Sequence, residues 1–395
     1  MKLIASLGKY TRLGIVAIFI SSLLAAGCGG GGGGGGNGGS SLFSISGTVL
    51  GLTGSGLVLQ NNGTDDLDIS LDGNFTFATA LADLSGYAIT VKTQPTVPNQ
   101  TCVVTNGVGN INNLNVSNVS VNCTIFANLL VGASAPNKIL RFNETTGAFI
   151  DDFVSTGSGG LDNPLGIAMS RDRKLYVSSR LTGNVLRYDG TTGAFIDVFV
   201  PSGTGGLNLP HGLIFGPDGN LYVVNNTGNN VLRFDGTTGA FMDIFASGGL
   251  SAPTALIFGP DDNLYVSSSF NNRVIRFNGT TGSSMGIFAS GGLSNAQGLA
   301  FGPDGNLYVG SYNSSSVLRY DGSTGAFMDV FASGGGLVWT VAVVFGPDGN
   351  LYVSGSSSNN VVRYDGTTGA FIDEFIPTAS GGLIGGHHYI LFTSQ

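Results

Sequence analysis

The chain has 395 residues, of which 66 are glycine, 42% are hydrophobic and only 10% are charged. Such a composition excludes intrinsic disorder for most of the chain, because disordered segments are rich in charge and poor in apolar side chains. The formal net charge of −8 argues against a nucleic-acid partner, since proteins that bind nucleic acids present clustered positive charge.

Residues 1–27 have the pattern of a secretory signal peptide. Lys2, Lys9 and Arg12 form a basic region ahead of an apolar stretch, Gly14–Ala26. This stretch is too short for a comfortable transmembrane span, and it ends in small residues as signal peptides do.

Residues 24–28 read LAAGC, and this motif resembles a bacterial lipobox. The resemblance implies that Cys28 is acylated, with palmitate among the expected chains, and that it becomes the first mature residue. Several acyl chains on one residue are sufficient for stable membrane attachment. Gly29 stands where an aspartate is typical of lipoproteins kept at the inner membrane, so the resemblance implies an outer-membrane location in the cell envelope. The alternative is a plain secretory signal.

Residues 28–41 are expected to be a flexible, glycine-rich tether, and residues 42–125 a small all-β domain. Short runs with β-branched residues, such as Tyr87–Lys92, are separated by Gly, Asn and Asp turns. They predict a β-sandwich, and the segment resembles the immunoglobulin-like spacer modules of bacterial surface proteins. Cys102 and Cys123 lie in this segment of a secreted chain, which predicts a disulfide between them.

Residues 127–395 contain an internal repeat, which determines the expected fold. The consensus of the units is GPDGNLYV followed by VLRYDGTTGAF, and its arginine recurs about every 45 residues, at Arg141, Arg187, Arg233, Arg276, Arg319 and Arg363. In the third unit four strands are expected, at Gly212–Phe215, Leu221–Val224, Val231–Phe234 and Phe241–Phe245. Four antiparallel strands at this period form one blade of a β-propeller.

The two ends of the repeat complement each other. Leu129–Val131 aligns with the second strand of the other units, and His388–Phe392 aligns with their first strand. The sequence therefore predicts a six-bladed β-propeller in which a C-terminal latch strand joins three strands of the first blade and removes an exposed edge. The pattern is similar to NHL-repeat and streptogramin-lyase-like propellers.

Residues that depart from the repeat are the candidates for function. At the start of the innermost strand, one position per unit holds, from the first unit to the sixth, His388, Leu165, His211, Thr254, Gln297 and Val341. His388, His211 and Gln297 belong to alternate units, so they are expected to converge at the mouth of the central channel. The two histidines are therefore candidate ligands of a divalent metal such as zinc.

This arrangement resembles the peptidyl-α-hydroxyglycine amidating lyases, which are six-bladed propellers with metal-ligating histidines on alternate inner strands. The resemblance covers His211 and His388 but not Gln297, which is a poor zinc ligand. The alternative interpretation is a ring of polar side chains around a water-filled channel.

The repeated arginine, together with an aspartate on the fourth strand of most units, is expected to form a structural ion pair. The tyrosine of the second strand is expected to pack between blades. Trp339, the only tryptophan in the chain, precedes an innermost strand, where it either stacks on a ligand at the channel mouth or packs between blades.

These observations predict a lipid-tethered protein whose propeller is a non-catalytic binding or scaffolding module for a protein, peptide or glycan. The membrane, reached through the lipid anchor, is the other expected partner, and no cofactor is expected apart from the candidate metal. The alternative function is that of a metal-dependent lyase or hydrolase with its site at the channel mouth.

Replacing Cys28 with alanine is expected to abolish labelling by fatty acids and sedimentation with membranes, because the acyl chains provide the attachment. Ala25→Leu, which restores the residue usual in a lipobox, is expected to keep both properties. Unchanged labelling of the Cys28→Ala variant would contradict lipidation at this residue.

Overall fold

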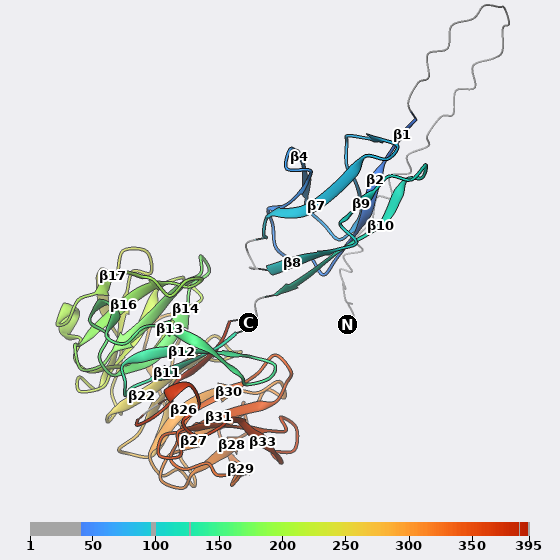
Figure 1. Cartoon of the computed structure of the whole chain (residues 1–395). Helices are drawn as coiled ribbons and strands as arrows, with labels where there is room; N and C mark the ends of the chain where they lie inside the picture. The colour runs from blue at the N-terminus through green and yellow to red at the C-terminus, as the bar shows by residue number, and fades with distance from the viewer. Residues whose placement is uncertain (1–40, 96–99, 126–127, 387, 394–395) are drawn as a thin grey trace, which may run out of the picture.

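A computed structural model describes residues 41–95, 100–125, 128–386 and 388–393. The described residues form β-strands and three short 3-10 turns, Ser158–Gly160, Thr204–Gly206 and Ser380–Gly382 (Figure 1). Among them there is no helix of the length and apolar character needed to cross a membrane. The predicted signal peptide, the tether and Cys28 lie outside the described residues.

The N-terminal segment, residues 42–125, contains two four-stranded sheets and a two-stranded ribbon. One sheet has the order β5-β2-β10-β8, with bounds Gly73–Thr76, Ile45–Leu50, Val116–Ile125 and Gln100–Thr105. The other has the order β4-β3-β7-β9, with bounds Asp65–Ile69, Leu57–Asn61, Gly86–Thr93 and Val108–Asn110. The ribbon pairs β1, Leu42–Phe43, with β6, Leu81–Ala82. Side chains from both sheets share one core, so the predicted sandwich arrangement is present.

The predicted disulfide joins Cys102 on β8 to Cys123 on β10. These two residues are direct partners on neighbouring antiparallel strands, and both are buried. The prediction from cysteine usage is therefore confirmed. In the loop-entropy account, a bridge between residues this far apart in sequence stabilises the domain by about 3 kcal/mol.

The sequence pattern predicted some strands of the N-terminal segment incorrectly. The apolar and β-branched run over residues 43–49 predicts a single strand, but the strand is interrupted at Ser44, whose N–H donates to Asn115 Oδ1 at 2.9 Å. The short strands β6 and β9 were not predicted, because two or three residues carry no periodic signal.

Residues 128–392 form six antiparallel four-stranded sheets. The first sheet contains β34, β11, β12 and β13, at Ile390–Phe392, Asn128–Ala133, Lys138–Asn143 and Phe149–Val154. The second contains β14 to β17, at Pro164–Met169, Lys174–Ser179, Asn184–Asp189 and Phe195–Val200. The third contains β18 to β21, at Pro210–Phe215, Leu221–Asn225, Asn230–Phe234 and Phe241–Ser247.

The remaining sheets follow the same order. The fourth contains β22 to β25, at Pro253–Phe258, Leu264–Ser268, Arg273–Phe277 and Ser284–Ala289. The fifth contains β26 to β29, at Ala296–Phe301, Leu307–Ser311, Ser316–Tyr320 and Phe327–Ser333. The sixth contains β30 to β33, at Thr340–Phe345, Leu351–Gly355, Asn360–Tyr364 and Phe371–Ile376.

The C-terminal strand β34 completes the first sheet, as the alignment of the repeat ends predicted. It pairs antiparallel with β11, and Val131 lies opposite Ile390. The first sheet also packs against the sixth, since Val131 and Phe142 share a core cluster with Tyr352 and Phe375. The series of sheets therefore returns to its start, and the inner edge of the first sheet is covered rather than exposed.

An aromatic pair joins neighbouring sheets at five of the interfaces in this part of the chain. The tyrosine of the second strand packs edge-on against the phenylalanine that ends the first strand of the next sheet, with ring centroids 4.9 to 5.2 Å apart. The pairs are Tyr176–Phe215, Tyr222–Phe258, Tyr265–Phe301, Tyr308–Phe345 and Tyr352–Phe392. The prediction that these tyrosines pack between sheets is confirmed. Between the first and second sheets, Leu130 and Met169 take the two positions.

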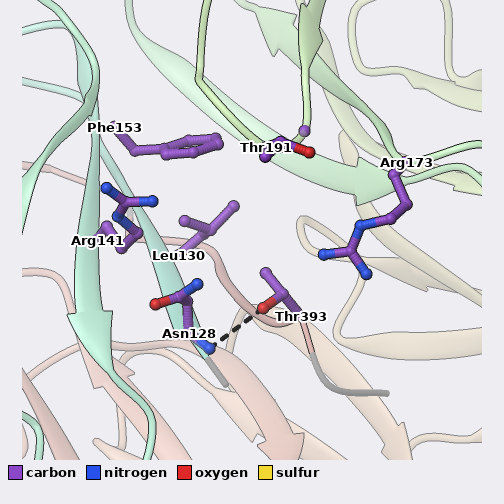
Figure 2. Close-up of a pocket in the computed structure, with 8 residues that line it drawn as sticks. Asn128, Leu130, Arg141, Phe153, Arg173, Thr191 and Thr393 are labelled. Atoms are coloured by element: carbon purple, nitrogen blue, oxygen red, sulfur yellow. Dashed lines mark hydrogen bonds between the residues drawn. The ribbon is translucent and has the colours of Figure 1, made fainter. Parts of the chain in front are cut away.

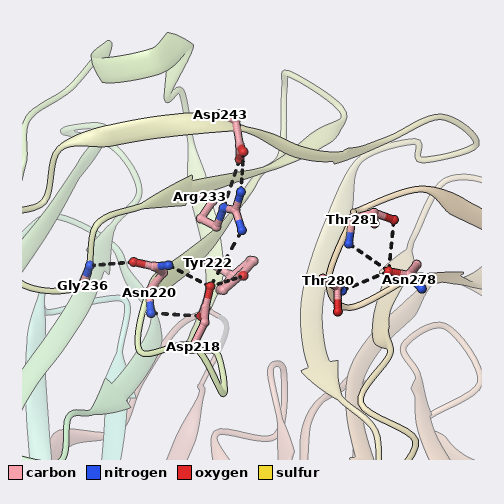
Figure 3. Close-up of polar contacts among 9 residues, drawn as sticks. All are labelled: Asp218, Asn220, Tyr222, Arg233, Gly236, Asp243, Asn278, Thr280 and Thr281. Atoms are coloured by element: carbon pink, nitrogen blue, oxygen red, sulfur yellow. Dashed lines mark hydrogen bonds and ion pairs between the residues drawn. The ribbon is translucent and has the colours of Figure 1, made fainter.

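The third, fifth and sixth repeats also share a polar network on the face of the tight turns, which Figure 3 shows for the third. Asp218 accepts a hydrogen bond from the Tyr222 hydroxyl at 3.0 Å and lies 3.8 Å from the Arg233 guanidinium. Arg233 pairs with Asp243 on the next strand and lies over the Phe245 ring. The predicted Arg–Asp pair is confirmed, and its partial exposure limits its contribution to about 0–1 kcal/mol.

Removing residues 387–395 is expected to abolish cooperative unfolding and to lower solubility, because β11 then presents an unpaired edge and the first core loses the Phe392 ring. A matched control replaces exposed Ile384 with serine, which leaves β34 intact. Thermal unfolding followed by circular dichroism checks the result. A truncated protein with an unchanged melting midpoint would contradict closure by β34.

Candidate functional site at the channel mouth

His211 and His388 occupy equivalent places in the third and first sheets, as predicted. The His211 carbonyl accepts a hydrogen bond at 2.6 Å from the hydroxyl of Ser178, on the second strand of the preceding sheet. The His388 carbonyl accepts the corresponding bond from Ser354. Both imidazoles are buried, with 7% of His211 and none of His388 exposed.

Both imidazole rings contact neighbouring protein groups. Arg180 Nε donates to His211 Nε2 at 3.2 Å. His388 Nδ1 lies 3.2 Å from the carbonyl of Gly132, and its Nε2 lies 3.3 Å from Asn359 Oδ1. A zinc ligand must offer a bare nitrogen lone pair. An ion bound at His388 would therefore have to displace one of these contacts.

Gln297, the third residue of the predicted set, is buried as well. Its Nε2 donates to Asn295 Oδ1 at 2.6 Å, while its Oε1 has no hydrogen-bond partner among the described residues. Within the part of the chain that the structure describes, no group of three or more His, Cys, Asp or Glu side chains is placed to hold a metal. The zinc site at His211 and His388 stays a prediction.

Small residues on the inner strands narrow the centre of the ring. The residue that follows the predicted site position is small in five of the sheets, namely Gly166, Gly212, Ala255, Gly298 and Ala342. The inner strands approach so closely that a Cβ added to Gly166 would lie 2.5 Å from the His211 carbonyl oxygen. What remains is a cavity of about 100 Å³ with largely apolar walls.

Tyr389 takes the equivalent position in the first sheet and helps to close the centre. Its hydroxyl donates across the ring to the Thr254 carbonyl of the fourth sheet at 3.2 Å. Burial raises the pKa of Tyr389, so that the neutral, donating form is the stable one. A ligand is therefore expected to bind on the face of the ring rather than inside it.

Trp339 lies on the face that carries the loops between sheets. The residue is 46% exposed, and its ring stacks on that of Tyr312, with centroids 5.5 Å apart and an interplanar angle of 18°. The backbone of Trp339 is left-handed, with φ of 61°. The equivalent residues of four other sheets are also left-handed, namely Asn163, Leu209, Ala252 and Asn295. The stack on Tyr312 joins the sixth sheet to the fifth, while the exposed part of Trp339 leaves room for a ligand, so both predicted roles stay open.

Sequence reasoning missed Tyr312 and Arg180. Both occupy the loop after the second strand, at the position where other sheets have Asn226, Ser269 and Ser356. The aligned repeats showed that a large side chain replaces a small polar one at this position in two sheets. The contacts with Trp339 and His211 were not visible, because they cross from one sheet to the next.

No protein-family model matches the chain, and no curated protein is similar to it in sequence. Among solved structures, a nidogen/laminin complex contains a chain with a TM-score of 0.55 and 18% identity, covering 67% of this chain and 98% of that one. A protein of unknown function from Bacteroides caccae has a TM-score of 0.52 and 14% identity, covering 67% of this chain and 98% of that one. Virginiamycin B lyase from Staphylococcus aureus has a TM-score of 0.46 and 16% identity, covering 59% of this chain and 75% of that one. A TM-score this low supports no inference.

The fold and the first two likenesses define the class: the chain carries a β-propeller built from repeated four-stranded sheets. At these identities the likeness extends to the fold alone.

If the histidines bind zinc, the purified protein is expected to contain about one equivalent of the ion. His211→Ala is expected to release it without unfolding the propeller, whose cores do not include the site. Because the ligands must be neutral imidazoles, affinity should fall as the pH drops through the ordinary histidine pKa of about 6.5. Protein that is metal-free at neutral pH, with a melting midpoint insensitive to added Zn²⁺, would contradict the site.

Proposed function

We propose that the protein is a lipid-tethered binding module of the bacterial cell envelope, anchored through Cys28 and located at the outer membrane. Residues 42–125 act as an immunoglobulin-like spacer, and the remainder is a six-bladed NHL-type propeller that presents the ligand. The six four-stranded sheets, together with the packing of the first against the sixth, support this blade count. The LAAGC motif and the glycine run that follows it support the tether.

The exposed ring of Trp339 carries the proposal that the propeller binds a ligand. A left-handed backbone costs a residue with a bulky side chain roughly 1–2 kcal/mol, and such strain is concentrated at functional sites. Asparagine, which tolerates this conformation, stands at the equivalent place in two other sheets, as Asn163 and Asn295. The backbone conformation therefore does not account for a tryptophan at this place, and we attribute its presence to the contacts of its ring.

The surroundings of Trp339 favour a neutral, polar ligand such as a glycan or an uncharged peptide. The loops on this face are rich in Gly, Ser and Asn, as in residues 225–230 and 355–360. Rigid aromatic rings among small polar residues combine contact area with adaptable hydrogen bonding, as they do in antibody binding loops. Residues 225–230 and 355–360 include no titratable side chain for acid–base catalysis, which supports binding over chemistry.

The equivalent positions of His211 and His388 favour a second candidate function, that of a metal-dependent lyase or hydrolase. The zinc measurement described above separates this candidate from the binding module, because a lyase of this kind requires the ion.

Trp339→Asn is expected to weaken ligand binding by about tenfold or more, as loss of a central aromatic contact does. The melting midpoint should stay equal or rise, because asparagine relieves the backbone strain. Binding of neutral oligosaccharides and peptides is measured through the fluorescence of the single tryptophan, and by calorimetry for the variant.

Leu181→Ser, an exposed apolar residue of another loop on the same face, serves as the matched control and should bind normally. A ligand that binds the Trp339→Asn variant as tightly as the parent protein would contradict the site.

A further inference from the structure

The interface between the first and second sheets differs from the other interfaces of the ring. Leu130 and Met169 replace the Tyr–Phe pair there, and a cavity of about 120 Å³ lies beside them. Figure 2 shows Arg141 and Arg173 on opposite sides of this space, extending from different sheets. The cavity is lined by Asn128, Leu130, Arg141, Phe153, Arg173, Gly190, Thr191 and Thr393.

The cavity lies on the face opposite to His211 and Trp339. Arg173 and Gly190 belong to the turns that follow the first and third strands of the second sheet, whereas His211 and Trp339 lie at the start of a first strand. Any ligand of this cavity is therefore distinct from the ligand proposed for the channel mouth.

Arg141 lacks an acidic neighbour that most equivalent arginines have. Four of them, Arg233, Arg276, Arg319 and Arg363, lie 3.8 to 3.9 Å from an aspartate in the turn after the first strand of their own sheet. Among the described residues Arg141 pairs only with Asp151, on the outer strand of its sheet. In place of a contact with a turn aspartate, Arg141 lines the cavity.

Arg173 adds a second positive charge. It has a φ of 59°, at the turn position where Gly219, Gly305 and Gly349 stand in other sheets. Its Nε is buried and has no hydrogen-bond partner, and Arg173 forms no ion pair within the described part of the chain. Burial lowers the pKa of Arg173, which is the effect of a charge removed from water without a compensating anion.

The remaining walls suit a small organic molecule. Leu130 and the Phe153 ring form an apolar side, and Arg141 lies 5.1 Å from the centre of that ring. Thr191 and Thr393 add hydroxyl groups near the two arginines, as Figure 2 shows. An apolar cavity of about 150 Å³ accommodates benzene, so a single ring or a short chain matches the space.

We propose that this cavity binds a small organic acid, with its carboxylate between Arg141 and Arg173 and its apolar part against Leu130 and Phe153. The carboxylate takes the place that a turn aspartate has in four other sheets. Guanidinium groups suit this role because their planar array of donors matches a carboxylate. A carboxylate between the two arginines would also give the Arg173 guanidinium, whose Nε is buried without a hydrogen-bond partner, the anion that it lacks.

Benzoate is the probe, and benzamide is its uncharged match of nearly the same shape. Calorimetry and thermal unfolding of the mature protein, at low ionic strength, are expected to show saturable binding of benzoate near one equivalent. Benzamide is expected to bind at least about tenfold more weakly, since it lacks the charge. Equal binding of the two probes, or no binding of benzoate, would overturn the proposal.

Arg173→Gly separates binding from folding. Glycine is the residue that other sheets have at this turn, and it adopts a positive φ without strain. The variant is therefore expected to keep or raise the melting midpoint without ligand, while its affinity for benzoate falls by about tenfold or more. Arg171→Gln removes an exposed charge from the same turn and is expected to bind normally. Unchanged affinity in Arg173→Gly would overturn the proposal.

Discussion

Each four-stranded sheet of the ring can bury its two faces only against the sheets on either side of it. The contact that satisfies this constraint is the tyrosine of one sheet set edge-on against the phenylalanine of the next, as in Tyr222 and Phe258. The last of these contacts, Tyr352 with Phe392, forms only when β34 lies beside β11. The core between the sixth and first sheets thus depends on this closing step, because an open series would leave two apolar faces in water.

The repeat made the architecture predictable. Alternating strand signals, the turn sequences and the complementary ends located the four-stranded sheets and the pairing of β34 with β11, because similar units repeat the same local pattern along the chain. The small N-terminal unit offered no such repetition. There the break at Ser44 and the brief strands β6 and β9 went unseen, since they depend on partners from distant parts of the chain.

The candidate sites were predicted less completely, for a related reason. Aligning the repeats placed His211 and His388 at one structural position, but it did not reveal that Arg180 donates to one imidazole or that Asn359 contacts the other. Nor did it reveal that Tyr389 reaches across the ring to Thr254. Contacts between units depend on how closely the inner strands approach, which is a property of the closed ring. The residues that break the repeat were nevertheless the informative ones, including Arg173, whose place glycine takes in three other sheets.

Closure by β34 also has a consequence for the order in which the protein folds. Val131 and Ile390 are direct partners across a strand pair although nearly the whole propeller sequence separates them. The entropic cost of joining chain ends grows only slowly with the length between them, but pairings of such high sequence separation form late and make folding slow. Until then the first sheet has three strands and an open edge, so the time between the folding of β11 to β13 and the arrival of β34 is when the chain is most exposed to pairing with another molecule.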